Sequence, residues 1–215
     1  ENPDLTKNMN GGGAFNWEPG QTTDDTDMAL AIVDSIVANG RYDPSDIAER
    51  FVWWMQSMPK DIGGLTRNSL KLVADGVSYR KSGEVLLASS KRPPIANGSV
   101  MRTYPIGLLF RGNPPKMFKA SDEISAITHA HSECLTACRM TCDVVANLAS
   151  GVDKAALPDI LAKDFKDTPA IDQLIEDALR GETHRKKNRG YGGAFESFNI
   201  AFNSLMKTDN FAEAI

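Results

Sequence analysis

The sequence predicts an all-α protein, a multi-helix bundle. Apolar residues recur every three or four positions in one segment after another, as they do from Met28 to Val37, and this spacing is typical of a helix that buries one face. Glycine and proline separate these segments, as at Gly40 and Pro44. Strand-like alternation is rare. With 41% hydrophobic residues among 215, the chain can bury the core of one domain.

The first half of the chain predicts three helices and one long loop. Glycine or proline ends each helix, and Asp43-Pro44 opens the second one with proline in its first turn. The expected helices are Met28–Val37, Pro44 to about Gln56, and about Thr66–Asp75. Residues 81–98 contain two glycines and two prolines with little periodicity, so we expect them to form a loop of the kind that is often functional.

The second half predicts further helices around one basic, glycine-rich loop at residues 183–193. Ser99 can open a helix, and Pro105 then lies in its first turn or kinks it. Ser132 can cap a long helix that ends near Gly151. The others are expected at Ala120–Thr128, 153–164, 170–180 and Ala194–Met206, with one more after Asp209. Neither a repeat nor a linker is visible, so residues 1–215 are interpreted as a single domain.

Charge and cysteine content narrow the classes of function. The net charge of −4 disfavours a general nucleic-acid binder, and the apolar runs are too short for a membrane span. Cys134, Cys138 and Cys142 follow one another at a spacing of four, which places them along one helix face. Their odd number and the lack of a signal-peptide pattern favour a buried core stripe over a disulfide framework. These features predict a cytoplasmic protein.

Three consecutive polar residues, Thr23, Asp24 and Asp25, precede the first helix. Hydroxyl and carboxylate oxygens are the hard ligands that Mg²⁺ or Mn²⁺ prefers, and a turn before a helix can direct them to one point. Acidic and threonine residues are also favoured at helix starts by capping and by the helix dipole. These residues alone therefore leave both interpretations open. Asp27, inside the first turn, is expected to cap the helix or to lie on its surface.

Three later features could contact a ligand. Asn97, Gly98 and Ser99 precede a helix start, where glycine permits close approach and free amides favour an anion such as phosphate. His129 could contact a phosphate or ribose, and Tyr191 lies between glycines, where its ring could stack on a base. Each has an ordinary alternative: a capped turn, a structural or capping histidine, and a solvated loop.

The order of these motifs resembles that of one family. The segments Gly11-Gly12-Gly13, Trp17-Glu18-Pro19-Gly20 and Thr23-Asp24-Asp25-Thr26-Asp27-Met28 come first, then Asp61-Ile62-Gly63-Gly64-Leu65-Thr66, Asn97-Gly98-Ser99-Val100-Met101-Arg102, Thr128-His129 and Gly190-Tyr191. In this order they resemble the ADP-ribosylglycohydrolase family, which includes the dinitrogenase reductase-activating glycohydrolases. The resemblance extends over almost the whole chain and implies an all-α fold.

The resemblance also implies roles for particular residues. Thr23, Asp24 and Asp25 would be ligands in a two-Mg²⁺ centre, in which Mn²⁺ is also possible. Asn97, Gly98 and Ser99 would hold ADP-ribose near its distal ribose and diphosphate. His129 would contact the nucleotide and Tyr191 would stack near the adenine. The implied activity is Mg²⁺-dependent hydrolysis that releases ADP-ribose from modified protein side chains through an N- or O-glycosidic bond. The implied partners are ADP-ribosylated proteins or ADP-ribose derivatives, with no nucleic acid and no membrane.

The resemblance has two departures. The family's opening G-D-A-x-G-x-P-x-E region would lie before Glu1, and its closing G-G-D-x-D-T metal motif would follow Ile215. The chain is therefore expected to be incomplete at both ends and to hold half of the metal site. The catalytic acid or base cannot be assigned from these residues. The alternative function is an ADP-ribose-binding or partner-binding module with impaired catalysis.

Overall fold

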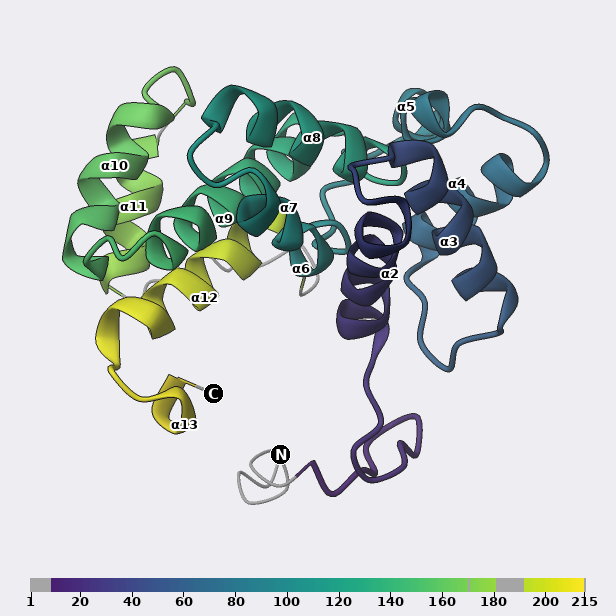
Figure 1. Ribbon diagram of the computed structural model, residues 1–215, viewed down its shortest axis with the longest axis horizontal. Coiled ribbons are helices and arrows are strands. Elements are labelled where there is room, and N and C mark those ends of the chain that lie inside the picture. The colour runs from purple at the N-terminus through teal and green to yellow at the C-terminus, as the bar shows by residue number, and fades with distance from the viewer. Residues whose placement is uncertain (1–8, 170, 181–191, 215) are drawn as a thin grey trace.

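The computed structural model describes residues 9–169, 171–180 and 192–214. In these ranges the chain forms helices, and pairing between extended segments is limited to two isolated β-bridges, Gly12 with Trp17 and Ala96 with Gly193. The predicted all-α class is confirmed. Figure 1 shows α2 to α5 at one end of the molecule and α10 to α13 at the other, with α6 to α9 between them.

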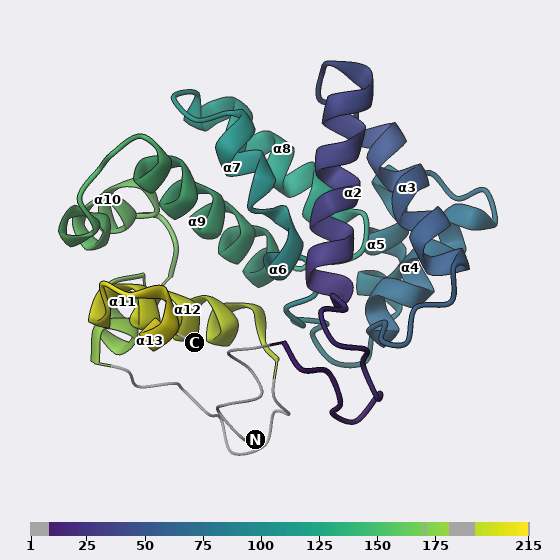
Figure 2. The ribbon, with the colours of Figure 1, turned by 60° about the horizontal axis from the view of Figure 1, so that its bottom comes forward.

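The helices follow one another with short connections. Those of the first half are α2 (Asp24–Asn39), α3 (Pro44–Gln56), α4 (Gly64–Ala74), α5 (Tyr79–Ser89), α6 (Val100–Thr103) and α7 (Pro105–Leu109). Those of the second half are α8 (Pro114–Ala126), α9 (Ser132–Ala149), the 3₁₀ turn η1 (Lys154–Ala156), α10 (Leu157–Asp164), α11 (Ile171–Arg180), α12 (Ala194–Lys207) and α13 (Phe211–Ala214). The view in Figure 2 shows α12 running beneath α9.

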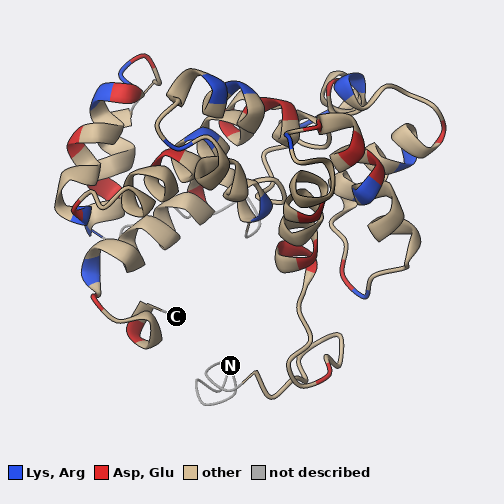
Figure 3. Ribbon diagram, viewed as in Figure 1, with Lys and Arg blue, Asp and Glu red and all other residues tan. Residues whose placement is uncertain are grey.

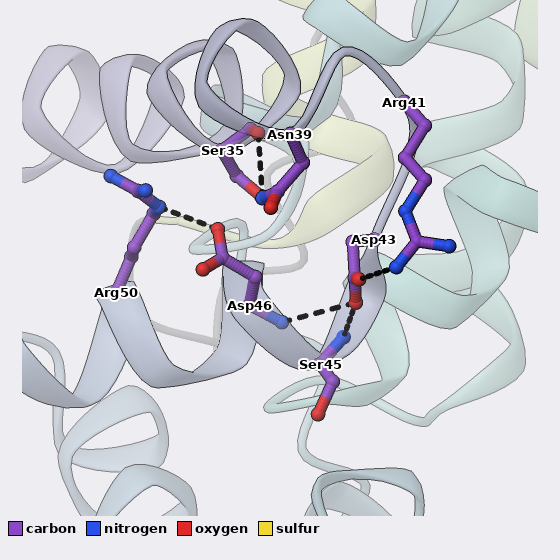
Figure 4. Close-up of polar contacts among 7 residues, drawn as sticks. All are labelled: Ser35, Asn39, Arg41, Asp43, Ser45, Asp46 and Arg50. Atoms are coloured by element: carbon purple, nitrogen blue, oxygen red, sulfur yellow. Dashed lines mark hydrogen bonds and ion pairs between the residues drawn. The ribbon is translucent and has the colours of Figure 1, made fainter.

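The corner between α2 and α3 shows how local sequence sets a helix start. Asp43 precedes Pro44, and its carboxylate accepts from the amides of Ser45 and Asp46 at 3.1 and 3.3 Å (Figure 4). Arg50 then donates to the Asp46 carboxylate at 2.6 Å, one helical turn later. Capping of this kind typically contributes about 1 kcal/mol, and proline in the first turn loses no hydrogen bond. The predicted start of this helix is confirmed.

The long loop predicted for residues 81–98 is wrong in its first half, because α5 continues to Ser89. The glycine that suggested a loop, Gly83, is buried where α5 crosses α8. A Cβ atom at Gly83 would lie 2.1 Å from the carbonyl oxygen of Ala126, so the missing side chain permits the contact between the two helices. Ser82, next to it, donates to the carbonyl of Ile127 at 2.7 Å. The irregular segment covers only residues 90–99.

Other helix starts differ from the prediction. Helix α2 begins at Asp24 rather than Met28, so Asp24 and Asp25 lie in its first turn and not in a turn before the helix. Helix α8 begins at Pro114 rather than Ala120, because Asn113 caps it by accepting from the amide of Lys116. Helix α9 is capped by His131, whose Nδ1 accepts from the amide of Glu133 at 3.2 Å, and not by Ser132. Pro105 is the first residue of α7 and separates that helix from α6.

Among the described residues, two large clusters and one small cluster of buried side chains hold the helices together, and α9 contributes to all three. The first core lies among α2, α3, α4, α7, α8 and α9, and the second lies among α9, α10, α11 and α12. Residues of the first core include Met28, Ile32, Ile47, Phe51, Leu70, Ile106 and Ile124. Residues of the second core include Met140, Val144, Leu157, Leu161, Ile175, Phe198 and Phe202.

The three cysteines of α9 are buried and free, as the spacing predicted. Cys134 and Cys138 pack with Val100 and Ala194, and Cys142 belongs to the first core. They act as small core residues where α6, α7 and α12 approach α9. None of the described helices is long and apolar enough to cross a membrane.

Candidate active site

The first turn of α2 carries its acidic residues at the edge of the molecule. Thr23 is the N-cap residue, yet its hydroxyl makes no capping bond to the helix amides. It donates instead to Oδ2 of Asp25 at 2.7 Å. Asp24, the first helical residue, is half-buried and Asp25 is exposed. Capping by Thr23 therefore does not explain this motif.

The electrostatics of Asp24 set it apart from an ordinary surface carboxylate. Burial, followed by the negative charges of Asp25 and Asp61, raises the pKa of Asp24 from 3.8 to about 6. Asp61 lies in the connection between α3 and α4, far from Asp24 in sequence. Acidic residues gather at this end of α2 in Figure 3. Carboxylates that repel one another in a partly buried place favour the binding of a cation.

Asp27 has a different environment in the same turn. Its Oδ1 accepts from the Thr22 hydroxyl at 2.7 Å and its Oδ2 accepts from the indole N–H of Trp54 at 3.2 Å. The side chain therefore joins α2 to α3, instead of capping the helix or pointing into solvent as expected. Both carboxylate oxygens of Asp27 thus already have a hydrogen-bond partner within the protein.

Lys60 contacts the turn formed by residues 11–17. Lys60 donates to the carbonyl oxygen of Asn16 at 2.8 Å, and its ammonium lies 5.4 Å from the centre of the Trp17 ring. Gly11 packs against the other side of the turn, where a Cβ atom would lie 2.3 Å from the carbonyl oxygen of Trp17. These contacts place residues 11–17 next to the connection that carries Asp61.

The segment at Asn97 is tied to the start of α12. Its backbone N–H donates to the carbonyl of Gly192, and Ala194 donates to the carbonyl of Ile95, both at 2.8 Å. The Asn97 side chain donates to the Ser197 hydroxyl at 2.9 Å. The residues just before α12 therefore meet the predicted ligand segment. Tyr191 itself lies outside the described residues.

Ser99 is fully buried. Its hydroxyl oxygen accepts from the hydroxyl of Ser125 at 2.8 Å and from the thiol of Cys138 at 3.3 Å. Its carbonyl accepts from the Thr103 hydroxyl at 2.6 Å. The side chain thus anchors the start of α6 in the interior, and the backbone of this turn is the part that a ligand could meet.

His129 lies directly against Gly98. A Cβ atom at Gly98 would be 2.9 Å from Cε1 of His129, 3.1 Å from its Nε2 and 3.2 Å from the Thr66 hydroxyl. Only glycine therefore allows the segment at 97–99 to approach both side chains. Burial, followed by the positive charge of Arg102, lowers the pKa of His129 to about 3, so the imidazole is neutral. His131, by contrast, only caps α9.

The oxygen atoms of Thr23, Asp24 and Asp25 suit Mg²⁺ by their chemistry. This ion binds hard oxygen ligands and keeps several waters in its coordination shell. The raised pKa of Asp24 is the sign of a carboxylate that a cation would stabilise. In the described part of the chain, no three Asp, Glu, His or Cys side chains are arranged to hold a metal ion by themselves.

Comparison with known proteins now identifies the family. A family model described as ADP-ribosylglycohydrolase matches residues 1–215. The chain belongs to the ADP-ribosylglycohydrolase family. The ADP-ribosylarginine hydrolase Tri1 of Serratia proteamaculans is 29% identical over 216 residues, which cover 96% of this chain and 56% of that protein. The ADP-ribosyl-[dinitrogen reductase] glycohydrolase of Rhodospirillum rubrum is 35% identical over 140 residues, which cover 63% of this chain and 45% of that protein.

The fold agrees with this membership. A solved structure described as an ADP-ribosylglycohydrolase-related protein complex superimposes with a TM-score of 0.72 and 25% sequence identity. The match covers 96% of this chain and 66% of that one. The chain spans about half the length of the curated relatives it matches.

Three residues at the candidate site had no individual role in the sequence interpretation. Asp61 acts on Asp24 through its charge, and Thr66 faces Gly98. Arg102 is fully buried and acts on His129. All three belong to motifs that carry the family resemblance, and this membership was the one indication in the sequence that they could lie at the site. Their partners lie far away in sequence, so only the fold shows what each one contacts.

Proposed function

We propose that this protein hydrolyses the glycosidic bond between ADP-ribose and a protein side chain, with Mg²⁺ held by Thr23, Asp24 and Asp25. The observation that carries the proposal is the position of Asp24, which is half-buried in the first turn of α2 beside Asp25 and within reach of the charge of Asp61 from the connection between α3 and α4. Family membership supports the reaction class. Arginine is the first linkage to test, since relatives are named ADP-ribosylarginine hydrolase.

Each part of the site has a task in this reaction. When bound, Mg²⁺ would polarise the ribose hydroxyls and activate water. Asp24 and Asp25 supply the negative charge that holds the ion, and Asp61 adds to it. Gly98 lets the segment at 97–99 lie against His129, and the neutral ring of His129 contacts the nucleotide. Asn97, fixed by Ser197, would orient the distal ribose.

A second candidate is an ADP-ribose-binding or partner-binding module. It is favoured by the close approach of the backbone at Gly98 to His129, a feature that a nucleotide could contact without a metal ion. Under this proposal the segment at 97–99 and His129 hold the nucleotide, and turnover is slow or absent. The three buried free cysteines fit a cytoplasmic location for either candidate.

One experiment separates the candidates. The purified 215-residue protein is incubated with arginine-ADP-ribosylated protein and Mg²⁺, and free ADP-ribose is measured by chromatography. Serine-ADP-ribosylated protein is run in parallel, and EDTA provides the metal-free control. Release that requires Mg²⁺ supports hydrolysis. If calorimetry detects ADP-ribose binding without release, the binding module is the better description, and the absence of both would exclude both candidates.

A further inference from the structure

Arg102 is a fully buried cation that forms no ion pair in the described part of the chain, although the negative charge of Asp24 acts on it from a longer distance. Among the described residues, no Asp or Glu side chain lies within ion-pair distance of its guanidinium. Its Nε has no hydrogen-bond partner. Instead the guanidinium lies 4.6 Å from the centre of the Phe51 ring and donates weakly to the sulfur of Met28 at 3.3 Å. Burying a charge in this way is costly, so the position calls for a specific explanation.

The one strong hydrogen bond of Arg102 goes to Thr128. Nη2 of the guanidinium donates to the Thr128 hydroxyl oxygen at 2.6 Å. The same hydroxyl oxygen lies 2.6 Å from Nδ1 of His129. Three buried side chains therefore form a continuous line that ends at the ring facing Gly98.

The direction of the bonds along this line follows from the inventory of donors. A guanidinium can only donate, so the Thr128 oxygen accepts from Arg102 and its proton must go elsewhere. In the described structure, Nδ1 of His129 is the other partner of that hydroxyl. If Nδ1 carried a proton, the Thr128 oxygen would accept from both Arg102 and Nδ1, and the buried hydroxyl proton would have no partner among the described residues.

The structure assigns Arg102 and Thr128 the task of holding His129 as the neutral tautomer with its proton on Nε2. Nδ1 accepts from Thr128, and the Nε2–H edge of the ring faces Gly98. Arg102 is a positioning residue: it fixes the direction of the Thr128 hydroxyl, and Thr128 fixes the ring. The charge of Arg102 also opposes protonation of the imidazole, in agreement with the pKa of His129 near 3.

The consequence concerns ligand choice at the segment 97–99. A fixed Nε2–H donates a hydrogen bond and cannot accept one there. The ligand atom that meets His129 must therefore be an acceptor, such as a hydroxyl, carbonyl or phosphate oxygen or an unprotonated ring nitrogen. This last step rests on the proposed function, whereas the tautomer itself is a property of the protein without ligand.

The test reads the tautomer directly by NMR. The chain has three histidines, so protein labelled with ¹⁵N-histidine gives three imidazole spin systems, and loss of one in His129→Gln assigns the signal. We expect His129 to show a protonated Nε2 and an unprotonated Nδ1 in the unmodified protein. A protonated Nδ1 would overturn the inference, and this measurement requires no variant of Arg102 or Thr128 to fold.

Variants then test the hydrogen bonds that connect Arg102, Thr128 and His129. Thr128→Val keeps the shape but removes the hydroxyl, and should give a mixture of tautomers and weaken ADP-ribose binding about tenfold. Thr128→Ser restores the hydroxyl and should restore both the single tautomer and the affinity for ADP-ribose. Arg102→Met should mix the tautomers while leaving Thr128 in place. The matched control is Thr103→Val, a buried threonine on α6 that donates to the Ser99 carbonyl and should leave the tautomer unchanged.

The outcomes distinguish this inference from the proposed function. An unchanged Nε2–H tautomer in Thr128→Val would show that threonine serves only for packing, and would overturn the inference. If the tautomer behaves as expected but calorimetry detects no ADP-ribose binding to the unmodified protein, the positioning of His129 stands and the proposed function fails.

Discussion

The second core and the polar network beside the first core bury different kinds of side chain. The second core packs aromatic rings against one another. The ring centres of Phe118 and Phe165 are 5.4 Å apart, and those of Phe198 and Phe202 are 5.5 Å apart. Beside the first core, polar side chains occupy the interior around α6 and the end of α8 and form a connected network. Its members are Ser99, Arg102, Thr103, Ser125, Thr128 and His129.

This difference indicates that the second core mainly stabilises the fold, whereas the polar network mainly orients side chains of the candidate site. Apolar rings gain free energy from any close packing, whereas buried polar groups must each find a partner in the right direction. The second core therefore serves mainly to hold α9 and α12 together. The polar network beside the first core serves to fix the orientation of side chains that reach the candidate site. Changes in the two regions should have different effects, and the predictions below test that separation.

The largest effect on stability is expected from Phe202→Ala in the second core. Removing a buried ring typically lowers the free energy of unfolding by about 3–5 kcal/mol, which chemical denaturation can measure. The control is Phe211→Ala, because that side chain is 80% exposed and should change stability by less than about 0.5 kcal/mol. The ¹⁵N signals of His129 should be unchanged in both variants. A changed tautomer in Phe202→Ala would show that the two regions are not independent.

Asp24→Asn, by contrast, should reduce activity without reducing stability. We expect Mg²⁺-dependent release of ADP-ribose to fall by about a hundredfold or more, because a metal-holding charge is lost. Stability should be unchanged or higher, since the carboxylate is held in an unfavourable environment. Asp27→Asn is the matched control in the same turn. It should retain activity within a fewfold and lose about 1 kcal/mol of stability, because it weakens the contacts to Thr22 and Trp54.

Gly98→Ala should disturb the site with only a moderate loss of stability. The added Cβ atom would press on the His129 ring and the Thr66 hydroxyl, which must move by a few tenths of an ångström. We expect calorimetry to show ADP-ribose affinity about tenfold lower and a loss of about 1 kcal/mol in unfolding free energy. Gly64→Ala is the control, since its Cβ atom would meet open space. Equal affinities of the two variants would argue against a ligand at Gly98.

The smallest effect concerns a carboxyl group at the border of the second core. Burial, followed by the charge of Asp164, raises the pKa of Asp143 from 3.8 to about 6. Loss of its proton as the pH rises towards 6 therefore destabilises the folded state, while below about pH 3 the group is neutral in both states. Asp143→Asn should stabilise the protein by about 1 kcal/mol at pH 8 and by nothing measurable at about pH 3. A gain of equal size at both pH values would rule out this cause.

The second core could be predicted from the sequence because its signal is local. Apolar residues at helical spacing mark 153–164 and 170–180, and the structure places α10 and α11 there. The prediction failed at Gly83, where glycine serves contact between helices instead of ending one. A glycine in a helix and a glycine in a loop look the same until the neighbouring helix is known.

The candidate site could be predicted only as separate segments. The motifs at 23–25, 97–99 and 129 pointed to ligand chemistry, but nothing in the sequence shows that Asp61 acts on Asp24 or that Arg102 reaches His129 through Thr128. These are contacts between residues distant in the chain, and they follow from how the helices pack. The predicted metal and ligand roles stay predictions for the experiments above.

The hydrogen bond from Asn97 to Ser197 also has a consequence for biosynthesis. Its two residues are 100 positions apart, so the segment at 97–99 emerges from the ribosome well before its partner. At about 5–20 residues per second, the nascent chain must wait roughly 5–20 s before residues 192–197 can close this contact. During that interval the ligand segment lacks its final restraint, and a chaperone or a ligand present in the cell would meet it in an unfinished form.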